Sequence, residues 1–136
     1  MVELLIGKKG TGKTKALIDK VNTALTVAKG NVVYIGNTDE NMFAIKSKAR
    51  MANTSEFDIE SYSEFLGFIC GIVSRDFDIT NIFVDSIFKI VGTTELDGFE
   101  DFLKRLENMG QKFNIDFVIS VSIDADTAPD YIKRLA

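Results

Sequence analysis

The chain begins with MVELLIGKKGTGKT, residues 1 to 14, which carry the most specific pattern in the sequence. The apolar run from Val2 to Ile6 predicts a buried strand, and residues 14 to 28 predict a helix with one apolar side. Between them, residues 7 to 14 match G-x-x-x-x-G-K-S/T at every fixed position. A strand, a glycine-rich loop and a helix in this order predict an α/β fold with an anion-binding loop after its first strand.

The composition of this loop suits a phosphate site. Gly7, Gly10 and Gly12 permit backbone dihedrals that a Cβ atom disfavours, so successive N–H groups can face one anion at the positive end of the following helix. Lys13 is predicted to reach the β- and γ-phosphates, and the Thr14 hydroxyl to ligate Mg²⁺. The alternative is a glycine-rich turn without a ligand, which the flanking strand and helix disfavour. The predicted nucleotide-binding residues are Gly7, Lys8, Lys9, Gly10, Thr11, Gly12, Lys13 and Thr14.

A second pattern lies at Asn81-Ile82-Phe83-Val84-Asp85-Ser86, where an apolar strand ends in an acid. In an open α/β sheet, ligands bind beyond the carboxyl ends of the strands. Asp85 is therefore predicted to lie near Thr14 and to hold Mg²⁺, usually through a water molecule. The predicted catalytic residues are Lys13 and Asp85, the predicted metal ligands are Thr14 and Asp85, and the predicted ligands are ATP and Mg²⁺.

These motifs resemble those of the P-loop NTPases, in particular the RecA-like ATPases and the core of the thymidine kinase family. As a whole, the sequence resembles small stand-alone bacterial ATP-binding proteins often labelled twitching motility protein PilT. The resemblance implies one three-layer α/β/α domain over residues 1–136, with a mostly parallel sheet of about five strands. In RecA-like ATPases, the strand between the loop strand and the Walker B strand ends in a polar residue facing the γ-phosphate. Ser120 and Ser122 resemble that position, although a serine that merely ends a strand is an equally good interpretation.

The sequence also departs from these families. It contains no histidine, so it lacks the histidine box of the pilus-retraction ATPases, and the likeness to them is confined to residues 7–14. The acid of thymidine kinases is followed by glutamate, whereas Ser86 follows Asp85 here, and the single Cys70 cannot form their four-cysteine zinc site. The N-K-x-D motif that reads guanine is missing. The candidates for orienting the nucleophile are Asp39, Glu40 and Asp124, with Glu95 a weaker one.

Composition and charge exclude several classes of function. The chain has 136 residues, 46% of them apolar, and a net charge of −4, which argues against general affinity for nucleic acid or anionic membranes. Residues 1 to 30 nevertheless carry six lysines and two acids, so the predicted phosphate site is basic. No apolar run reaches the ~20 residues that span a bilayer, and no signal peptide is recognised. Cys70 is expected to be a small core residue, and the expected setting is the reducing cytoplasm.

Between the two motifs, the pattern predicts a left-handed helix cap at Gly30 and a buried strand over 31–36. Residues 37–55 predict a loop with at most one turn of helix, and 57–60 a short edge strand. The basic residues of that loop are expected on a solvated surface; the alternatives are a contact with nucleotide, with a neighbouring subunit or with an acidic partner. They are Lys46, Lys48 and Arg50.

The second half of the chain reads as further βα units. The pattern predicts a helix from Ser61 to about Arg75, a connection over 87–96, a helix from Asp97 to Gly110, a strand over 113–122 and a short C-terminal helix. Ser61 with Glu64 and Asp97 with Glu100 are the predicted helix caps, and Gly110 is the predicted stop.

Three functions fit these residues. The first is an ATPase or nucleotide switch whose site a protein partner or self-assembly completes. The second is a nucleotide-binding interaction module without useful turnover, and the third is a small-molecule kinase. Because no nucleophile-orienting acid and no arginine finger is placed by the sequence, intrinsic hydrolysis is expected to stay below ~1 turnover per minute.

Overall fold

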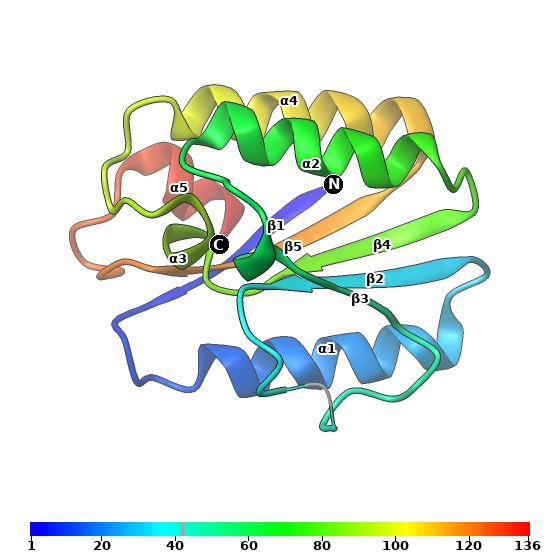
Figure 1. Ribbon diagram of the computed structural model, residues 1–136. Helices are drawn as coiled ribbons and strands as arrows, with labels where there is room; N and C mark the ends of the chain where they lie inside the picture. The colour runs from blue at the N-terminus through cyan, green and yellow to red at the C-terminus, as the bar shows by residue number, and fades with distance from the viewer. Residues whose placement is uncertain (42) are drawn as a thin grey trace.

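Strands and helices alternate along the chain, of which the computed structural model describes residues 1–41 and 43–136. Within these residues, five strands form one parallel sheet in the order β1-β5-β4-β2-β3 (Figure 1). The strands are β1 (Val2–Gly7), β2 (Asn31–Gly36), β3 (Arg50–Asn53), β4 (Ile79–Val84) and β5 (Asp116–Ser122). The helices are α1 (Lys13–Val27), α2 (Tyr62–Ser74), α3 (Ile87–Val91), α4 (Phe99–Phe113) and α5 (Asp130–Leu135), with a 3₁₀ turn η1 (Thr54–Glu56).

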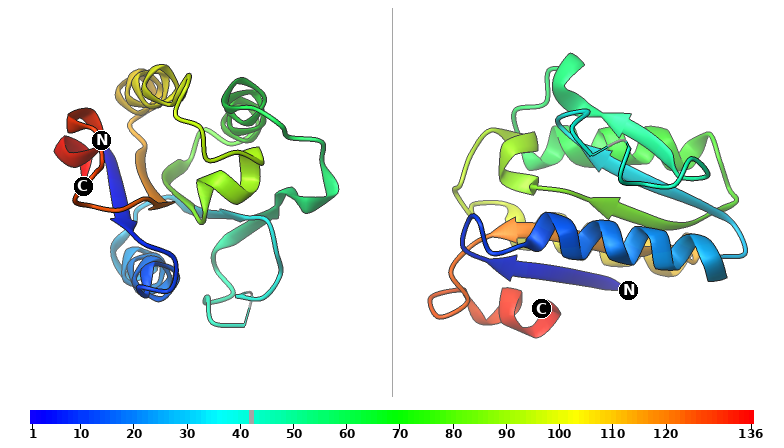
Figure 2. Two further views of the ribbon diagram at one scale, coloured as in Figure 1. Left: turned by 90° about the vertical axis from the view of Figure 1, so that its left-hand side faces the viewer. Right: turned by 90° about the horizontal axis from the view of Figure 1, so that it is seen from below.

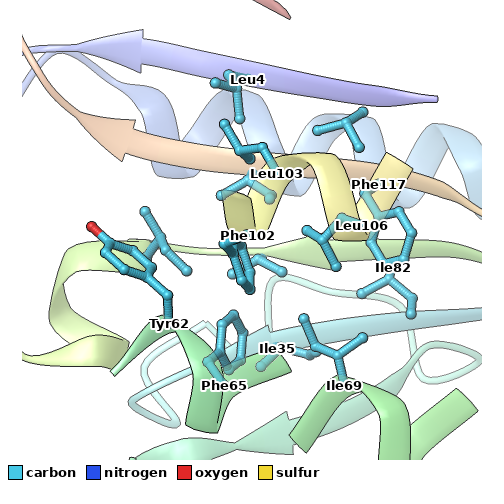
Figure 3. Close-up of a cluster of buried hydrophobic side chains, with 14 of the residues drawn as sticks. Leu4, Ile35, Tyr62, Phe65, Ile69, Ile82, Phe102, Leu103, Leu106 and Phe117 are labelled. Carbon is cyan, nitrogen blue, oxygen red and sulfur yellow. The ribbon is translucent and has the colours of Figure 1, made fainter. Parts of the chain in front are cut away.

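The sheet separates two apolar cores. α2 and α4 cover one face and α1 covers the other (Figures 1 and 2), as expected for a three-layer α/β/α arrangement. Because successive strand residues face opposite sides, β2 directs Val33 and Ile35 toward α2 and α4, and Val32 and Tyr34 toward α1. Figure 3 shows side chains of the larger core, on the α2 and α4 side. The predicted α/β class and the parallel five-stranded sheet are confirmed.

The strand order brings the two sequence motifs to one edge of the sheet. β5 lies between β1, which leads into the glycine-rich loop, and β4, which leads to Asp85. All strands run the same way, so their carboxyl ends lie together, at the left of Figure 1. The left view of Figure 2 looks onto this edge. β5 thus occupies an inner position in the sheet, between the loop strand and the acid-bearing strand, which is the arrangement that the RecA-like resemblance implies.

The prediction for the outer edge of the sheet is wrong. Residues 57–60 pair with no described strand; the edge strand is β3, which pairs with β2 in the register Val33↔Arg50 to Gly36↔Asn53. The Asn53 side chain accepts a hydrogen bond from the Ser55 N–H at 2.9 Å and turns the chain out of the sheet. The predicted loop over 37–55 therefore contains a strand, and it also contains position 42, which lies outside the described residues.

Two glycines predicted to end helices act through close packing. Gly30 is not left-handed; α1 ends earlier, at Ala28, in extended backbone. A Cβ on Gly30 would overlap the carbonyl oxygen of Asp78, to which the Asn31 N–H donates a hydrogen bond of 2.8 Å. Gly110 does not stop α4, and a Cβ there would lie 2.6 Å from the Ile115 carbonyl oxygen.

Helix caps were predicted with mixed success. Ser61 caps α2 as predicted, accepting from the Glu64 N–H at 3.1 Å. Asp97 does not cap α4, because Gly98 is the N-cap residue and no side chain caps that helix. The left-handed residue that ends α4 is Asn114, with φ 58°.

Two further expectations are corrected. The connection over 87–96 contains the short helix α3, which the sequence did not predict. Cys70 is exposed and not a core residue, because it lies on the side of α2 that faces away from the sheet. No helix among the described residues is both long and apolar enough to cross a membrane.

Candidate functional site

The loop between β1 and α1 is held open by its own backbone geometry. Gly10 and Gly12 have φ values of 84° and 85°, in the left-handed region that favours glycine. A Cβ on Gly7 would lie 2.6 Å from the Thr11 hydroxyl oxygen, so a larger residue there would displace that side chain. The Thr11 hydroxyl itself donates to the Lys8 carbonyl at 2.7 Å and closes the turn.

The first turn of α1 offers free donors to this loop. Gly12 is its N-cap residue, no side chain caps the helix, and the first turn contains no acid. The leading N–H groups of a helix have no partner within it, and they attract anions together with the helix dipole. The 15-residue helix therefore ends in an uncapped positive terminus directed at the loop.

Lys13 stands at this terminus. Its ammonium donates to the Lys8 carbonyl at 2.8 Å and lies 3.5 Å from the Thr11 hydroxyl. Burial lowers the pKa of Lys13, and the nearby Asp85 carboxylate partly offsets that shift. Both oxygens that the ammonium contacts within the described residues belong to the loop, so the ammonium lies next to the place where an anion would bind.

Thr14 and Asp85 meet across 71 positions of sequence. The Thr14 hydroxyl lies 3.2 Å from Oδ1 and 3.4 Å from Oδ2 of Asp85. Asp85 is only 8% exposed and forms no salt bridge with a described lysine or arginine. A buried carboxylate needs hydrogen-bond donors, and here hydroxyl groups supply them.

Three further hydroxyls surround the same carboxylate. Ser120 donates to Oδ1 at 2.9 Å, Tyr34 donates to Oδ2 at 3.0 Å, and Ser86 lies 3.3 Å from Oδ1. Ser120 also accepts from the Ser86 N–H at 2.7 Å, which joins the ends of β4 and β5. Ser86 is left-handed, with φ 60°, and this turns the chain from β4 into α3.

Strand register explains this convergence. Val84 pairs with Ile35 on one side and Ile119 on the other, so Asp85 and Ser120 follow side by side. The Asp85 N–H continues the ladder, donating to the Ile35 carbonyl at 2.8 Å. Tyr34 precedes Ile35 on β2, and its long side chain extends past Gly36 to reach Asp85. A Cβ added to Gly36 would lie 3.4 Å from the Tyr34 ring.

The structure thus brings together Lys13, Thr14, Asp85 and Ser120. Ser122 is exposed and has no hydrogen bond from its hydroxyl within the described chain. Sequence reasoning missed Tyr34. The signal that could have found it is a tyrosine, with its polar hydroxyl, two residues before the end of an otherwise apolar buried strand.

Lys8 and Lys9 are exposed, as is the basic cluster of Lys46, Lys48 and Arg50. Lys8 forms a salt bridge with Asp124 at 3.5 Å. Arg50, the first residue of β3, forms a salt bridge with Asp76 at 3.0 Å. The interpretation of that cluster as a solvated surface agrees with its exposure.

The four acids considered for orienting a nucleophile lie in different surroundings. Asp124 is next to the loop through Lys8, and a hydrogen bond from the Asp126 N–H, with help from Lys8, lowers the pKa of Asp124. Asp39 accepts from the Asn53 amide at 3.0 Å, and Glu40 and Glu95 are exposed. Of the four, Asp124 alone contacts a loop residue in the described structure.

Two cavities flank the loop. One, of about 420 Å³, lies along β1 and includes Gly7, Thr11, Gly12 and Lys13 in its lining. The other, of about 520 Å³, lies beyond the ends of β4 and β5. Its polar lining residues are Lys9, Ser86, Lys89, Thr93, Thr94 and Ser122.

The residues fit Mg²⁺ with few protein ligands. Mg²⁺ in phosphate sites keeps waters and takes one or two oxygens from protein. Thr14 can donate its hydrogen to Asp85 while its oxygen lone pairs remain free for a cation. No cluster of three or more acids, cysteines or histidines that could hold a metal occurs in residues 1–41 and 43–136.

Comparison with known proteins found no match, neither to a protein-family model nor to a curated protein.

Proposed function

We propose that this chain binds ATP with Mg²⁺ in the loop of residues 7–14 and is a P-loop protein of the RecA-like type. It would act as a slow Mg²⁺-dependent ATPase or nucleotide switch that a protein partner or self-assembly completes. The observation that carries the proposal is the Thr14 hydroxyl 3.2 Å from the buried Asp85 carboxylate, directly after Lys13 and an uncapped helix terminus. The expected setting is the cytoplasm, and general nucleic-acid binding is not expected.

Each residue has a defined part in this proposal. The loop amides from Lys8 to Thr14 and the α1 terminus would hold the phosphates, with the Lys13 ammonium leaving the Lys8 carbonyl for them. Thr14 and Asp85 would hold Mg²⁺, Asp85 through a water molecule. ATP would supply the transferable phosphoryl group, and the metal would neutralise its developing charge.

Slow turnover follows from the residue after Asp85. Ser86 occupies that position and hydrogen-bonds to Asp85, so it does not present a carboxylate to a water molecule. A P-loop protein without such a group and without an arginine finger hydrolyses slowly until a partner supplies them. We expect less than ~1 turnover per minute from the isolated chain.

Two other functions have their own support. The same absence of a placed base favours a nucleotide-binding interaction module without useful turnover. The cavity of about 520 Å³ beside Lys9 and Ser86 is large enough for a small phosphoryl acceptor and favours, less strongly, a kinase. Product analysis with a nucleoside panel separates the kinase from the hydrolase.

Calorimetry tests the proposal with ATP and GTP, each with and without Mg²⁺. Lys13→Ala should weaken ATP binding at least tenfold, about 1.4 kcal/mol, because a phosphate loses its ammonium partner. Lys29→Ala is the matched control, an exposed lysine without a salt bridge in the described structure. Equal binding by wild type and Lys13→Ala, with both proteins folded, would refute the loop as the site. Mass measurement with and without ATP and Mg²⁺ tests assembly.

A further inference from the structure

We propose that Tyr34 is a positioning residue that holds the Asp85 carboxylate in the orientation needed for Mg²⁺. The inference rests on the proposed function and adds to it a residue outside both sequence motifs. Its basis is the contact of 3.0 Å between the Tyr34 hydroxyl and Asp85 Oδ2.

The carboxylate is fixed from both neighbouring strands. Ser120 on β5 donates to Oδ1 at 2.9 Å, and Tyr34 on β2 donates to Oδ2 at 3.0 Å. Because the neighbouring strands supply a donor to each oxygen, the carboxylate plane cannot rotate without breaking the bond to Ser120 or the bond to Tyr34. Thr14 lies within 3.2 to 3.4 Å of both oxygens, so the same plane sets the direction in which Thr14 meets Asp85.

The surroundings of Tyr34 make its hydroxyl a dependable donor. The side chain is 2% exposed and packs in the core beneath α1. Burial, followed by the charge of Asp85, raises the pKa of Tyr34 well above its ordinary value, so the phenol stays protonated. The Asn41 amide donates to the phenol oxygen at 3.4 Å, which leaves the phenol hydrogen for Asp85.

A purely structural tyrosine would behave differently. If the hydroxyl only compensated for burial, its loss would change stability and leave the response to Mg²⁺ intact. If it positions Asp85, its loss must reduce what Mg²⁺ adds to ATP binding, because Asp85 acts only through the metal. The useful quantity is therefore the ratio of ATP affinities with Mg²⁺ and with EDTA.

The test compares Tyr34→Phe with Tyr62→Phe by calorimetry under both conditions. Tyr62 is also a buried tyrosine whose hydroxyl makes a hydrogen bond, to the Glu95 carbonyl at 2.7 Å, but it lies in the opposite core. We expect Tyr34→Phe to lower the Mg²⁺-to-EDTA ratio about tenfold while ATP affinity in EDTA stays within twofold. Tyr62→Phe should leave the ratio unchanged, and Asn41→Ala should lower it by a smaller factor.

Thermal melts establish that each variant is folded. An unchanged ratio in Tyr34→Phe overturns the inference and leaves the loop as the nucleotide site. Equal losses in Mg²⁺ and in EDTA overturn it as well, because the hydroxyl would then act on the loop and not through the metal. If wild type binds no ATP at all, the proposed function fails, and this inference fails with it.

Discussion

Asp85 is a buried carboxylate surrounded by hydroxyls, with no salt bridge to it among the described residues. Hydroxyl donors compensate only in part for the loss of water around a charge. Burial of this charge is unfavourable for the stability of the fold, and the proposed Mg²⁺ would offset part of that cost.

Asp85→Asn tests this argument, because it removes the charge and keeps the shape. We expect the free energy of unfolding to rise by about 1 kcal/mol, roughly 4 °C in melting temperature, since hydroxyls can reorient toward a neutral amide. The gain in ATP affinity on adding Mg²⁺ should disappear. Asp97→Asn is the control and should change neither quantity, because Asp97 is exposed and forms no salt bridge with any residue that the structure describes. A large loss of stability in Asp85→Asn would mean that the carboxylate is a structural group in its own right.

At the scale of elements, the sequence predicts those helices and strands that a local pattern of residues defines. β1, β2 and α2 were placed well because apolar periodicity and a Ser61 cap define them. The sequence does not predict β3, because RMAN is only four residues long and lacks the apolar–polar alternation of a strand; its pairing with β2 makes it a strand. The glycine-rich loop and Asp85 are recognisable as sequence motifs, whereas the contact of Tyr34 with Asp85 depends on how the strands pair, and local sequence gives at most a polar tip on a buried strand as a signal for it.

The role of a glycine is difficult to predict from local sequence. The sequence predicts a left-handed helix cap at Gly30 and a helix stop at Gly110. In both cases the structure requires glycine for close approach to a carbonyl oxygen, of Asp78 and of Ile115 respectively. The sequence identifies that a small residue is needed, and the fold determines why.

Gly30→Ala should therefore destabilise the protein by about 3 kcal/mol, because the α1–β2 connection must move away from the Asp78 carbonyl. Gly71→Ala is the matched control, since nothing lies within 4 Å of the added methyl in the middle of α2. That variant should gain about 0.5 to 1 kcal/mol from helix propensity. Urea denaturation measures both, and equal effects of the two substitutions would contradict the packing explanation.

At the scale of the whole molecule, the sheet links two cores that each bury one tyrosine. Tyr34 lies in the core beneath α1, and Tyr62 lies in the core beneath α2 and α4. The proposed site draws on the first core alone, through Tyr34 and the start of α1. A measurement that reports on Tyr34 and Tyr62 individually therefore distinguishes the core that contacts the proposed site from the core on the other face of the sheet.

Alkaline unfolding provides that measurement. Burial raises the pKa of Tyr62 to about 12, and burial followed by the Asp85 charge raises the pKa of Tyr34 still further, both from an ordinary value of 10.0. The folded state then holds protons that the unfolded chain releases. The contribution of these two tyrosines to stability is therefore fully present below pH 10 and is lost as the pH rises through their folded pKa values. Each tyrosine contributes at most about 1.4 kcal/mol per pH unit to that fall. Urea denaturation between pH 8 and about 11 should show a shallower slope in Tyr34→Phe and in Tyr62→Phe, and the double variant should lose most of it. A wild-type slope that survives both substitutions would assign the alkaline transition to Tyr131, whose pKa burial also raises, or to lysine titration.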